Sequence, residues 1–124
     1  MVEAAIGVVL VLSVTASFAL APAAPDETAR LDAHAADAIE VLRVDAPVGA
    51  GATRLTALTR SATAERREQA PARTRLASVL PETVAFRVRT PYGSFGDPRP
   101  PGATVGVASA TTHHGRLTVR VWYA

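Results

Sequence analysis

Few side chains in this sequence could do chemistry, and they do not converge on one motif. His34 and Asp37 stand three positions apart, a spacing at which two helical residues could hold one side of a metal ion. His113 and His114 are adjacent, so on a strand they would point to opposite faces and could not share an ion. Two ligands are too few for a metal site, and the chain has no cysteine. We therefore expect no metal and no other cofactor.

The segment Gly93-Ser94-Phe95-Gly96 has a superficial likeness to the nucleophile elbow of hydrolases. It lacks the Gly-x-Ser-x-Gly spacing, and it lies in a proline-rich stretch rather than between a strand and a helix. We interpret it as a turn. Because no polar, convergent pocket can be built from the remaining residues, we predict that the protein is not an enzyme and identify no small-molecule substrate.

Arginine and tryptophan near the C-terminus are better candidates for a functional surface. Arg87 and Arg89 alternate with apolar residues, and Arg120 and Trp122 do the same further along. If the two segments are paired strands, these four side chains project from one face of the sheet. Arginine over tryptophan is favourable by about 0.5 to 1 kcal/mol when exposed, and both residue types are enriched at interface hot spots. The alternative is an amphipathic outer face that only shields the sheet.

The N-terminal segment has the length and composition of a membrane-spanning helix. Residues 4–21 contain no charge and no proline, and residues 22–24 bring the run to the length of about 20 residues that crosses a bilayer. Glu3, at its start, could pair with a positive group such as a neighbour's N-terminal amine. A stripe of small residues at a spacing of four, which chance also produces in an alanine-rich helix, would let helix backbones approach closely. It consists of Ser13, Ser17 and Ala21.

Three interpretations of this segment remain open: a plain membrane anchor, an assembly helix that packs against copies of itself, and a cleaved signal peptide. The small-residue pattern Ala19-Leu20-Ala21 favours the last of these. Arg30 and Arg43 follow the segment, and the positive-inside rule alone would place the rest of the chain in the cytoplasm. We give this rule no weight here, because charges encoded before Met1 would change the balance. We divide the chain into a membrane or assembly helix, residues 1–24, and a small α+β domain, residues 25–124.

The elements that must position these side chains follow from the spacing of the apolar residues. Residues 28–44 place leucine and alanine on one stripe, which predicts a helix. Residues 45–51 are rich in glycine and proline and predict a turn. A second helical region covers residues 52–80, with breaks expected at Ser61 and at Pro71. The residues predicted to be buried in it are Leu55, Leu58, Leu76, Val79 and Leu80.

Toward the C-terminus the period changes to two, which is typical of strands. Residues 84–89 form the first predicted strand, Val105 and Val107 lie on the second, and residues 117–123 form the third. Residues 91–102 predict a loop, because glycine and proline interrupt ladder pairing. We therefore predict an α+β fold in which a three-stranded antiparallel sheet packs one face on the helices.

Charge patterning argues against nucleic acid as a partner. The chain has 124 residues and a formal net charge of only +2. Acids stand beside the arginines, as in Glu65-Arg66-Arg67-Glu68, a pattern typical of a solvated helix face. A nucleic-acid-binding protein needs an uninterrupted basic stripe instead.

Four blocks of sequence carry a resemblance to a known family: residues 2–9, 31–38, 86–93 and 118–124. With them, the whole chain resembles an uncharacterised haloarchaeal family of short type IV pilin-like proteins. The resemblance implies a membrane-anchored, non-catalytic subunit or accessory of a pilus-like or secretion-associated assembly, with its C-terminal domain outside the cell. Its partners would be the membrane and other pilin-like subunits or itself. Glu3 would match the acid that pilins carry near the start of the mature helix. Prepilins carry a basic stretch and a peptidase site before that helix, so we expect either that the true start lies upstream of Met1 or that the chain is not processed.

Two alternatives stay open beside the assembly subunit. One is a membrane-tethered binding module that uses the arginine and tryptophan face of the sheet. The other is a small domain that is secreted after cleavage of a signal peptide.

Overall fold

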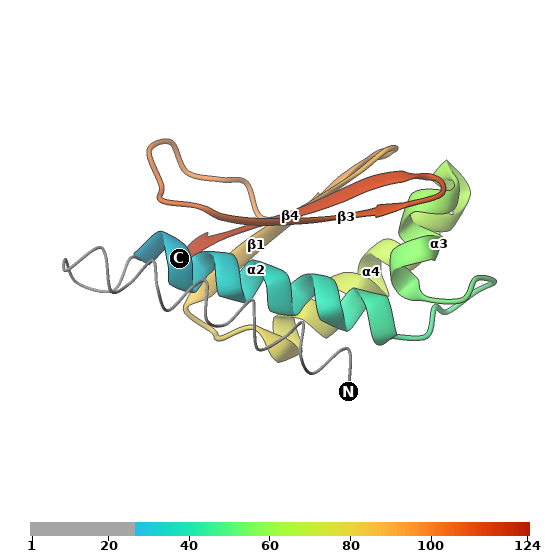
Figure 1. Cartoon of the computed structure of the whole chain (residues 1–124), viewed down its shortest axis with the longest axis horizontal. Coiled ribbons are helices and arrows are strands. Elements are labelled where there is room, and N and C mark those ends of the chain that lie inside the picture. Colours follow the sequence, from blue (N-terminus) through green and yellow to red (C-terminus); the bar gives the residue numbers. More distant parts are fainter. Residues whose placement is uncertain (1–26) are drawn as a thin grey trace, which may run out of the picture.

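In the part of the chain that the computed structural model describes, residues 27–124, three helices lie on one face of a four-stranded antiparallel sheet (Figure 1). The helices are α2 (Glu27–Val44), α3 (Arg54–Arg60) and α4 (Ala62–Val79). The strands are β1 (Val84–Thr90), β2 (Gly93–Gly96), β3 (Gly106–Thr112) and β4 (Gly115–Tyr123). The predicted membrane helix, with Glu3, Ser13, Ser17 and Ala21, lies outside the described residues. Within residues 27–124, no helix is both long and apolar enough to cross a membrane.

The predicted helix over residues 28–44 is confirmed as α2. Its buried residues are spaced so that they form one stripe along the helix: Leu31, Ala35, Ala38, Ile39 and Leu42. Glu27 in the first turn and Arg43 in the last turn match the sign of the helix dipole. The stripe faces the sheet, so α2 is positioned by burial of its apolar side.

The break at Ser61 is also confirmed. Ser61 is both the C-cap of α3 and the N-cap of α4. Its hydroxyl accepts a hydrogen bond from the Ala64 N–H at 3.0 Å. Thr53 caps α3 in the same way, accepting from the Thr56 N–H at 3.1 Å. Short hydroxyl side chains that satisfy free N–H groups therefore set where both helices begin.

The break predicted at Pro71 is wrong, because α4 runs through that residue. Proline inside a helix costs about 3 kcal/mol through the lost hydrogen bond and the ring clash. The helix is held on both sides of Pro71 by residues with no exposed surface, Glu68 before it and Ala72 and Leu76 after it. Burial of Leu76 alone offsets much of the cost, at about 1.5 to 3 kcal/mol. Val79, expected to be buried, is 38% exposed.

The sheet has four strands in the order β2-β1-β4-β3, so the prediction of three strands is wrong. The missed strand, β2, lies in the segment interpreted as a loop, and it pairs with β1 from Thr90↔Gly93 to Arg87↔Gly96. Phe95 anchors it by burying its ring against the core. Gly96 ends it with φ +114, where a Cβ would overlap the Phe86 carbonyl oxygen. Gly96 therefore marks the end of β2 and is not part of a long loop.

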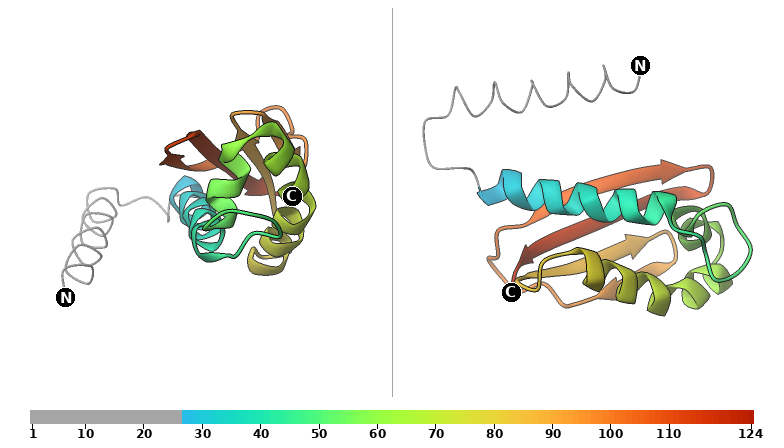
Figure 2. Two further views of the ribbon diagram at one scale, coloured as in Figure 1. Left: turned by 90° about the vertical axis from the view of Figure 1, so that its right-hand side faces the viewer. Right: turned by 90° about the horizontal axis from the view of Figure 1, so that it is seen from below.

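The core lies between the sheet and the helices. We call the sheet face toward the helices the inner face and the opposite one the outer face. Alternate residues of β1 and β4 line the inner face and pack against α2 and α4, which lie side by side beneath the sheet (Figure 2). Gly106 lets α2 approach β3 closely, since a Cβ there would overlap the backbone of Leu31. The inner face is therefore fully occupied, and the outer face is the side available for contacts.

Candidate functional site

The register of the sheet places the predicted interaction residues of the C-terminal segment on the outer face. Arg87 lies opposite Arg120, and Trp122 lies opposite Ala85. Residues directly opposite one another in an antiparallel pair share a face. Arg89 is two positions from Arg87 and therefore shares it too. All four side chains thus start from the side of the sheet that faces away from the helices.

Trp122 differs from the arginines because it is only 2% exposed. It does not belong to the apolar cluster of the inner face. The loop between β2 and β3, residues 97–105, arches over the outer side of the sheet near the end of β4, the strand that carries Trp122 (Figure 1). The outer face therefore divides into a covered end, with the tryptophan, and an open end, with the arginines.

Sequence reasoning missed one member of the open end, Arg116. It lies on β4 opposite Thr111 and is exposed. The signal was present, because Arg116, Thr118 and Arg120 alternate with the buried Leu117 and Val119. We call the set Arg87, Arg89, Arg116 and Arg120 the arginine face.

Two adjoining hollows run across the arginine face. The first has a volume of about 440 Å³ and is lined by Arg87, Arg89, Ser94 and Arg120 among others. The second, about 370 Å³, shares Arg89 with the first and adds Arg116. Each hollow is therefore bordered by at least two of these arginines, and Arg89 borders both.

Among the described residues, Arg87 alone of the four arginines has hydrogen-bond partners. Arg87 donates to the Ser94 hydroxyl at 2.8 Å and to the Asp97 carbonyl oxygen at 3.4 Å. Among residues 27–124, Arg89, Arg116 and Arg120 have no hydrogen-bond or ion-pair partner. Their donors are thus open to groups from another molecule.

The acids that could neutralise these arginines lie elsewhere in the chain. Residues 27–83 contain eight arginines and eight acids, whereas residues 84–124 contain five arginines and a single acid, Asp97. The interleaved charges seen in the sequence therefore belong to the helices. On the strands, the outer face carries positive charge alone.

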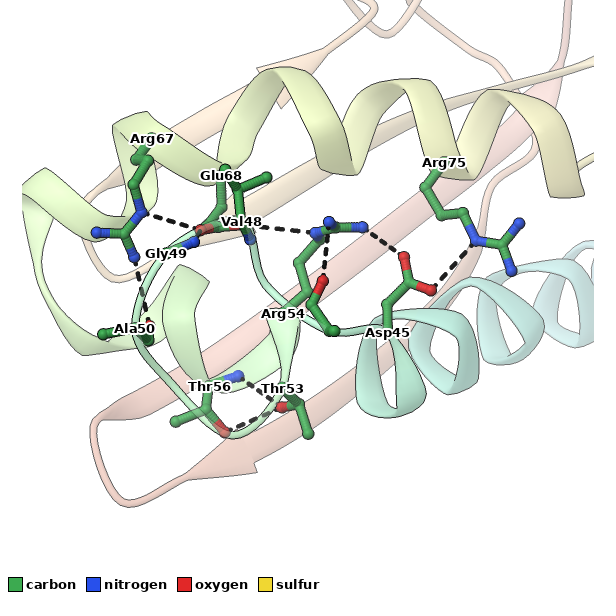
Figure 3. Close-up of polar contacts among 11 residues, drawn as sticks. Asp45, Val48, Gly49, Ala50, Thr53, Arg54, Thr56, Arg67, Glu68 and Arg75 are labelled. Atoms are coloured by element: carbon green, nitrogen blue, oxygen red, sulfur yellow. Dashed lines mark hydrogen bonds and ion pairs between the residues drawn. The ribbon is translucent and has the colours of Figure 1, made fainter.

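A second group of charges is buried between α4 and the connection from α2 to α3 (Figure 3). Glu68 has no exposed surface and accepts two backbone hydrogen bonds, from Val48 N–H at 2.9 Å and from Gly49 N–H at 3.0 Å. It also accepts from Arg67 Nε at 3.0 Å and from Arg54 Nε at 3.5 Å. Each carboxylate oxygen thus receives one backbone and one arginine donor.

Arg54 extends this cluster to the end of α2. Its Nη1 atom pairs with Asp45, and its Nη2 atom donates to the Ala46 carbonyl oxygen at 3.0 Å. Asp45 also accepts from Arg75 Nε at 3.3 Å. Across the described residues, no buried side-chain nitrogen or oxygen lacks a partner. Its buried polar atoms are paired with one another, so the cluster fixes residues 45–53 against α4.

Two opposing effects act on the pKa of Glu68. Burial acts to raise this pKa, but hydrogen bonds from the backbone N–H groups of Val48 and Gly49 and from Arg67 and Arg54 outweigh it. The pKa therefore lies below its ordinary value of 4.5. Glu68 stays ionised at neutral pH, as a carboxylate in a structural clamp should.

The remaining candidates from the sequence are Ser94 and the adjacent histidines, His113 and His114. Ser94 lies on β2, is exposed and accepts the hydrogen bond from Arg87, so it does not sit on a strand-to-helix elbow. His113 and His114 occupy the turn between β3 and β4. Within residues 27–124, no three His, Cys, Asp or Glu side chains are grouped closely enough to hold a metal ion.

Comparison with known proteins identifies one family. Residues 1–123 match the model of a family of unknown function, DUF7262. No curated protein and no solved structure matches the chain.

Proposed function

Because the chain belongs to DUF7262, a family of unknown function, we propose from its own geometry that it is a non-catalytic docking subunit whose arginine face binds an acidic protein surface. The observation that carries this proposal is the set of three arginines, Arg89, Arg116 and Arg120, that line two adjoining hollows without partners among the described residues. Arginine is the side chain best suited to bind carboxylates, because its planar fork can donate two parallel hydrogen bonds.

The choice of a protein partner over a lipid surface rests on what surrounds the arginines. Domains that lie on membranes combine basic residues with exposed aromatic or aliphatic side chains that enter the headgroup region. Here the single tryptophan is buried, and the exposed apolar side chain of the outer strand face is Val107. A face of guanidinium groups with one small exposed apolar side chain suits ion pairing with carboxylates better than insertion into a membrane.

The strength of such docking is set by exposed ion pairs. Each contributes about 0.2 to 1 kcal/mol, and salt screens it. We therefore propose that the arginine face gives orientation and rapid association more than tight binding. That property fits a subunit that meets its neighbours within one assembly.

The setting that we propose is a membrane-anchored, pilin-like or secretion-associated assembly, with the described domain outside the cell. Support comes from the resemblance in sequence and from the order of elements, a helix followed by an antiparallel sheet whose outer face is open. The alternatives are a tethered module outside any assembly and a secreted domain.

The docking proposal is tested with poly-L-glutamate as the acidic probe and the full chain in mild detergent. The double variant Arg89→Glu/Arg120→Glu should lose about tenfold in affinity, which corresponds to about 1.4 kcal/mol. The matched control is Arg66→Glu/Arg73→Glu, which makes the same change of net charge at two exposed positions of α4. Equal losses in both variants, or no binding by the wild type at low salt, would contradict the proposal.

The proposed setting has its own test, the N-terminus of the protein purified from its native host. Mass spectrometry of the membrane and soluble fractions identifies the first residue. A membrane-bound product that begins shortly before Glu3 would support assembly. A soluble product that begins near Pro22 would mean a cleaved signal peptide and would refute the anchored setting.

A further inference from the structure

The outer edge of β3 carries unpaired backbone groups. β3 is the last strand of the sheet, with β4 on one side only. The Val107 N–H donates to Asp32 Oδ1 at 2.8 Å, so this N–H points away from β4. Backbone groups alternate in direction along a strand, so those of Ser109 and Thr111 point outward as well. Among the described residues, neither of these two N–H groups has a partner.

The turn between β3 and β4 shows independently which backbone groups of β3 point away from β4. It has two residues, His113 and His114, and it joins the opposed pair Thr112 and Gly115. In a two-residue hairpin the residues next to the turn exchange hydrogen bonds with each other. The next residue along, Thr111, therefore directs its N–H and C=O away from β4.

This edge carries one charged side chain at its start, Asp32, and otherwise lacks the features that usually block strand addition. Proteins protect long edge strands with charged side chains, proline or bulges. The segment Gly106–Thr112 contains no charged residue and no proline over seven residues. Asp32 accepts the hydrogen bond from one N–H at the start of β3, that of Val107. The side chains of Val107, Ser109 and Thr111 are exposed. At the opposite edge, β2 has only four residues.

We propose that β3 pairs antiparallel with β3 of a second copy of this chain, about a two-fold axis at Ser109. In this register Ser109 exchanges both backbone hydrogen bonds with Ser109 of the second copy. The Thr111 N–H of each copy donates to the Val107 carbonyl oxygen of the other. Four hydrogen bonds form, and the Val107 N–H keeps its bond to Asp32. The product is a continuous sheet of eight strands.

The charges of the chain favour a second copy as the occupant. The outward side chains meet as Val107 opposite Thr111 and Ser109 opposite Ser109, pairs without charge that include β-branched partners. On the outer face the nearest like charges, Arg116 and Arg120 on β4, lie three strand spacings from those of the second copy, or about 14 Å. The two Asp32 carboxylates, one at each Val107, are separated by four residues along the strand direction, or about 13 Å. Both distances exceed the screening length of about 8 Å at physiological salt. The dimer therefore forms without strong electrostatic repulsion. Its two arginine faces lie on the same side of the continuous eight-stranded sheet.

The test is the mass of the full chain in mild detergent, measured by analytical ultracentrifugation over a range of concentrations. The wild type should show a monomer–dimer equilibrium. The variant Ser109→Pro should raise the dimer dissociation constant more than tenfold, because proline removes the outward N–H without touching the ladder to β4. Ser109→Ala is the matched control: both variants lose the hydroxyl contact with Thr118, and only the proline removes the N–H.

A second variant covers the case in which Ser109→Pro fails to fold. Thr111→Lys places a charge on the edge and should also give a monomer. A wild type that is monomeric throughout, or association that survives both edge variants, would overturn the proposal. Arg89→Glu/Arg120→Glu should remain dimeric, so failure of strand pairing and failure of the docking proposal are distinguishable.

Discussion

Replacing Glu68 by glutamine should destabilise the fold severely although it hardly changes the size of the side chain. Each carboxylate oxygen of Glu68 accepts from one backbone N–H and one arginine. An amide group presents one oxygen and one NH₂, and the NH₂ would face two donors. One backbone N–H and one guanidinium would then be left without an acceptor in a site that water does not reach.

The loss of stability in Glu68→Gln is estimated from the buried donors that are left without an acceptor. Removing one partner of a buried ion pair costs about 3 to 5 kcal/mol, because the remaining charge stays buried. An unsatisfied buried donor adds to this in the range of about 1 to 3 kcal/mol. A domain of this size is stable by about 5 to 15 kcal/mol in total. We expect a loss of about 3 to 5 kcal/mol for Glu68→Gln, since the arginines can in part turn to solvent.

Urea unfolding followed by tryptophan fluorescence measures this loss. Trp122 is the single tryptophan of the chain and is 2% exposed, so its emission reports global unfolding. The expected result is a lower midpoint at an unchanged slope. The control is Glu82→Gln, at an exposed position, which should change the free energy of unfolding by less than about 0.5 kcal/mol.

The effect should also depend on pH in a defined direction. Because the pKa of Glu68 is lowered on folding, its stabilising contribution is complete above the ordinary value of 4.5 and is lost as pH falls through the lower folded pKa. The difference between the wild type and Glu68→Gln should therefore be constant near neutral pH and shrink below pH 4.5. A loss under about 1 kcal/mol, or a difference that grows in acid, would refute the reasoning.

Two further predictions concern the contacts of the helices. Gly106→Ala should lower the free energy of unfolding by about 1 to 3 kcal/mol, because the added Cβ pushes the α2 backbone at Leu31 away from β3; an unchanged thermal midpoint would contradict the close approach. Pro71→Ala should raise the free energy of unfolding by up to about 3 kcal/mol, because alanine restores the missing N–H and removes the ring clash inside α4. Urea unfolding that shows no gain for Pro71→Ala would mean that the proline causes no strain there.

Local patterns in the sequence were sufficient for most of the elements. The stripe from Leu31 to Leu42 fixed the helix α2 and its buried side, because helical spacing is a property of neighbouring residues. Ser61 divided α3 from α4 through its capping hydroxyl. The period of two in β1 and β4 placed Arg87, Arg89 and Arg120 on the face opposite the core before any pairing was known.

Where a local rule competed with burial, the sequence was misleading. Glycine at both ends concealed β2, whose short strand depends on Phe95 reaching the core. Pro71 predicted a helix end, but packing on both sides of it keeps α4 continuous. In both cases long-range contacts outweighed a local preference of a few kcal/mol.

The sequence by itself determined the fold class, the inward side of the elements and the positions of the outer arginines, since these depend on residues close together in the chain. Tertiary structure alone decided which charges are free. It buried Glu68 with Arg54, fourteen positions away, and so turned an apparent solvated run into a closed clamp. It covered Trp122 and left Arg89, Arg116 and Arg120 without partners among residues 27–124. Solvent exposure and charge neutralisation depend on residues distant in sequence, and only folding brings those together.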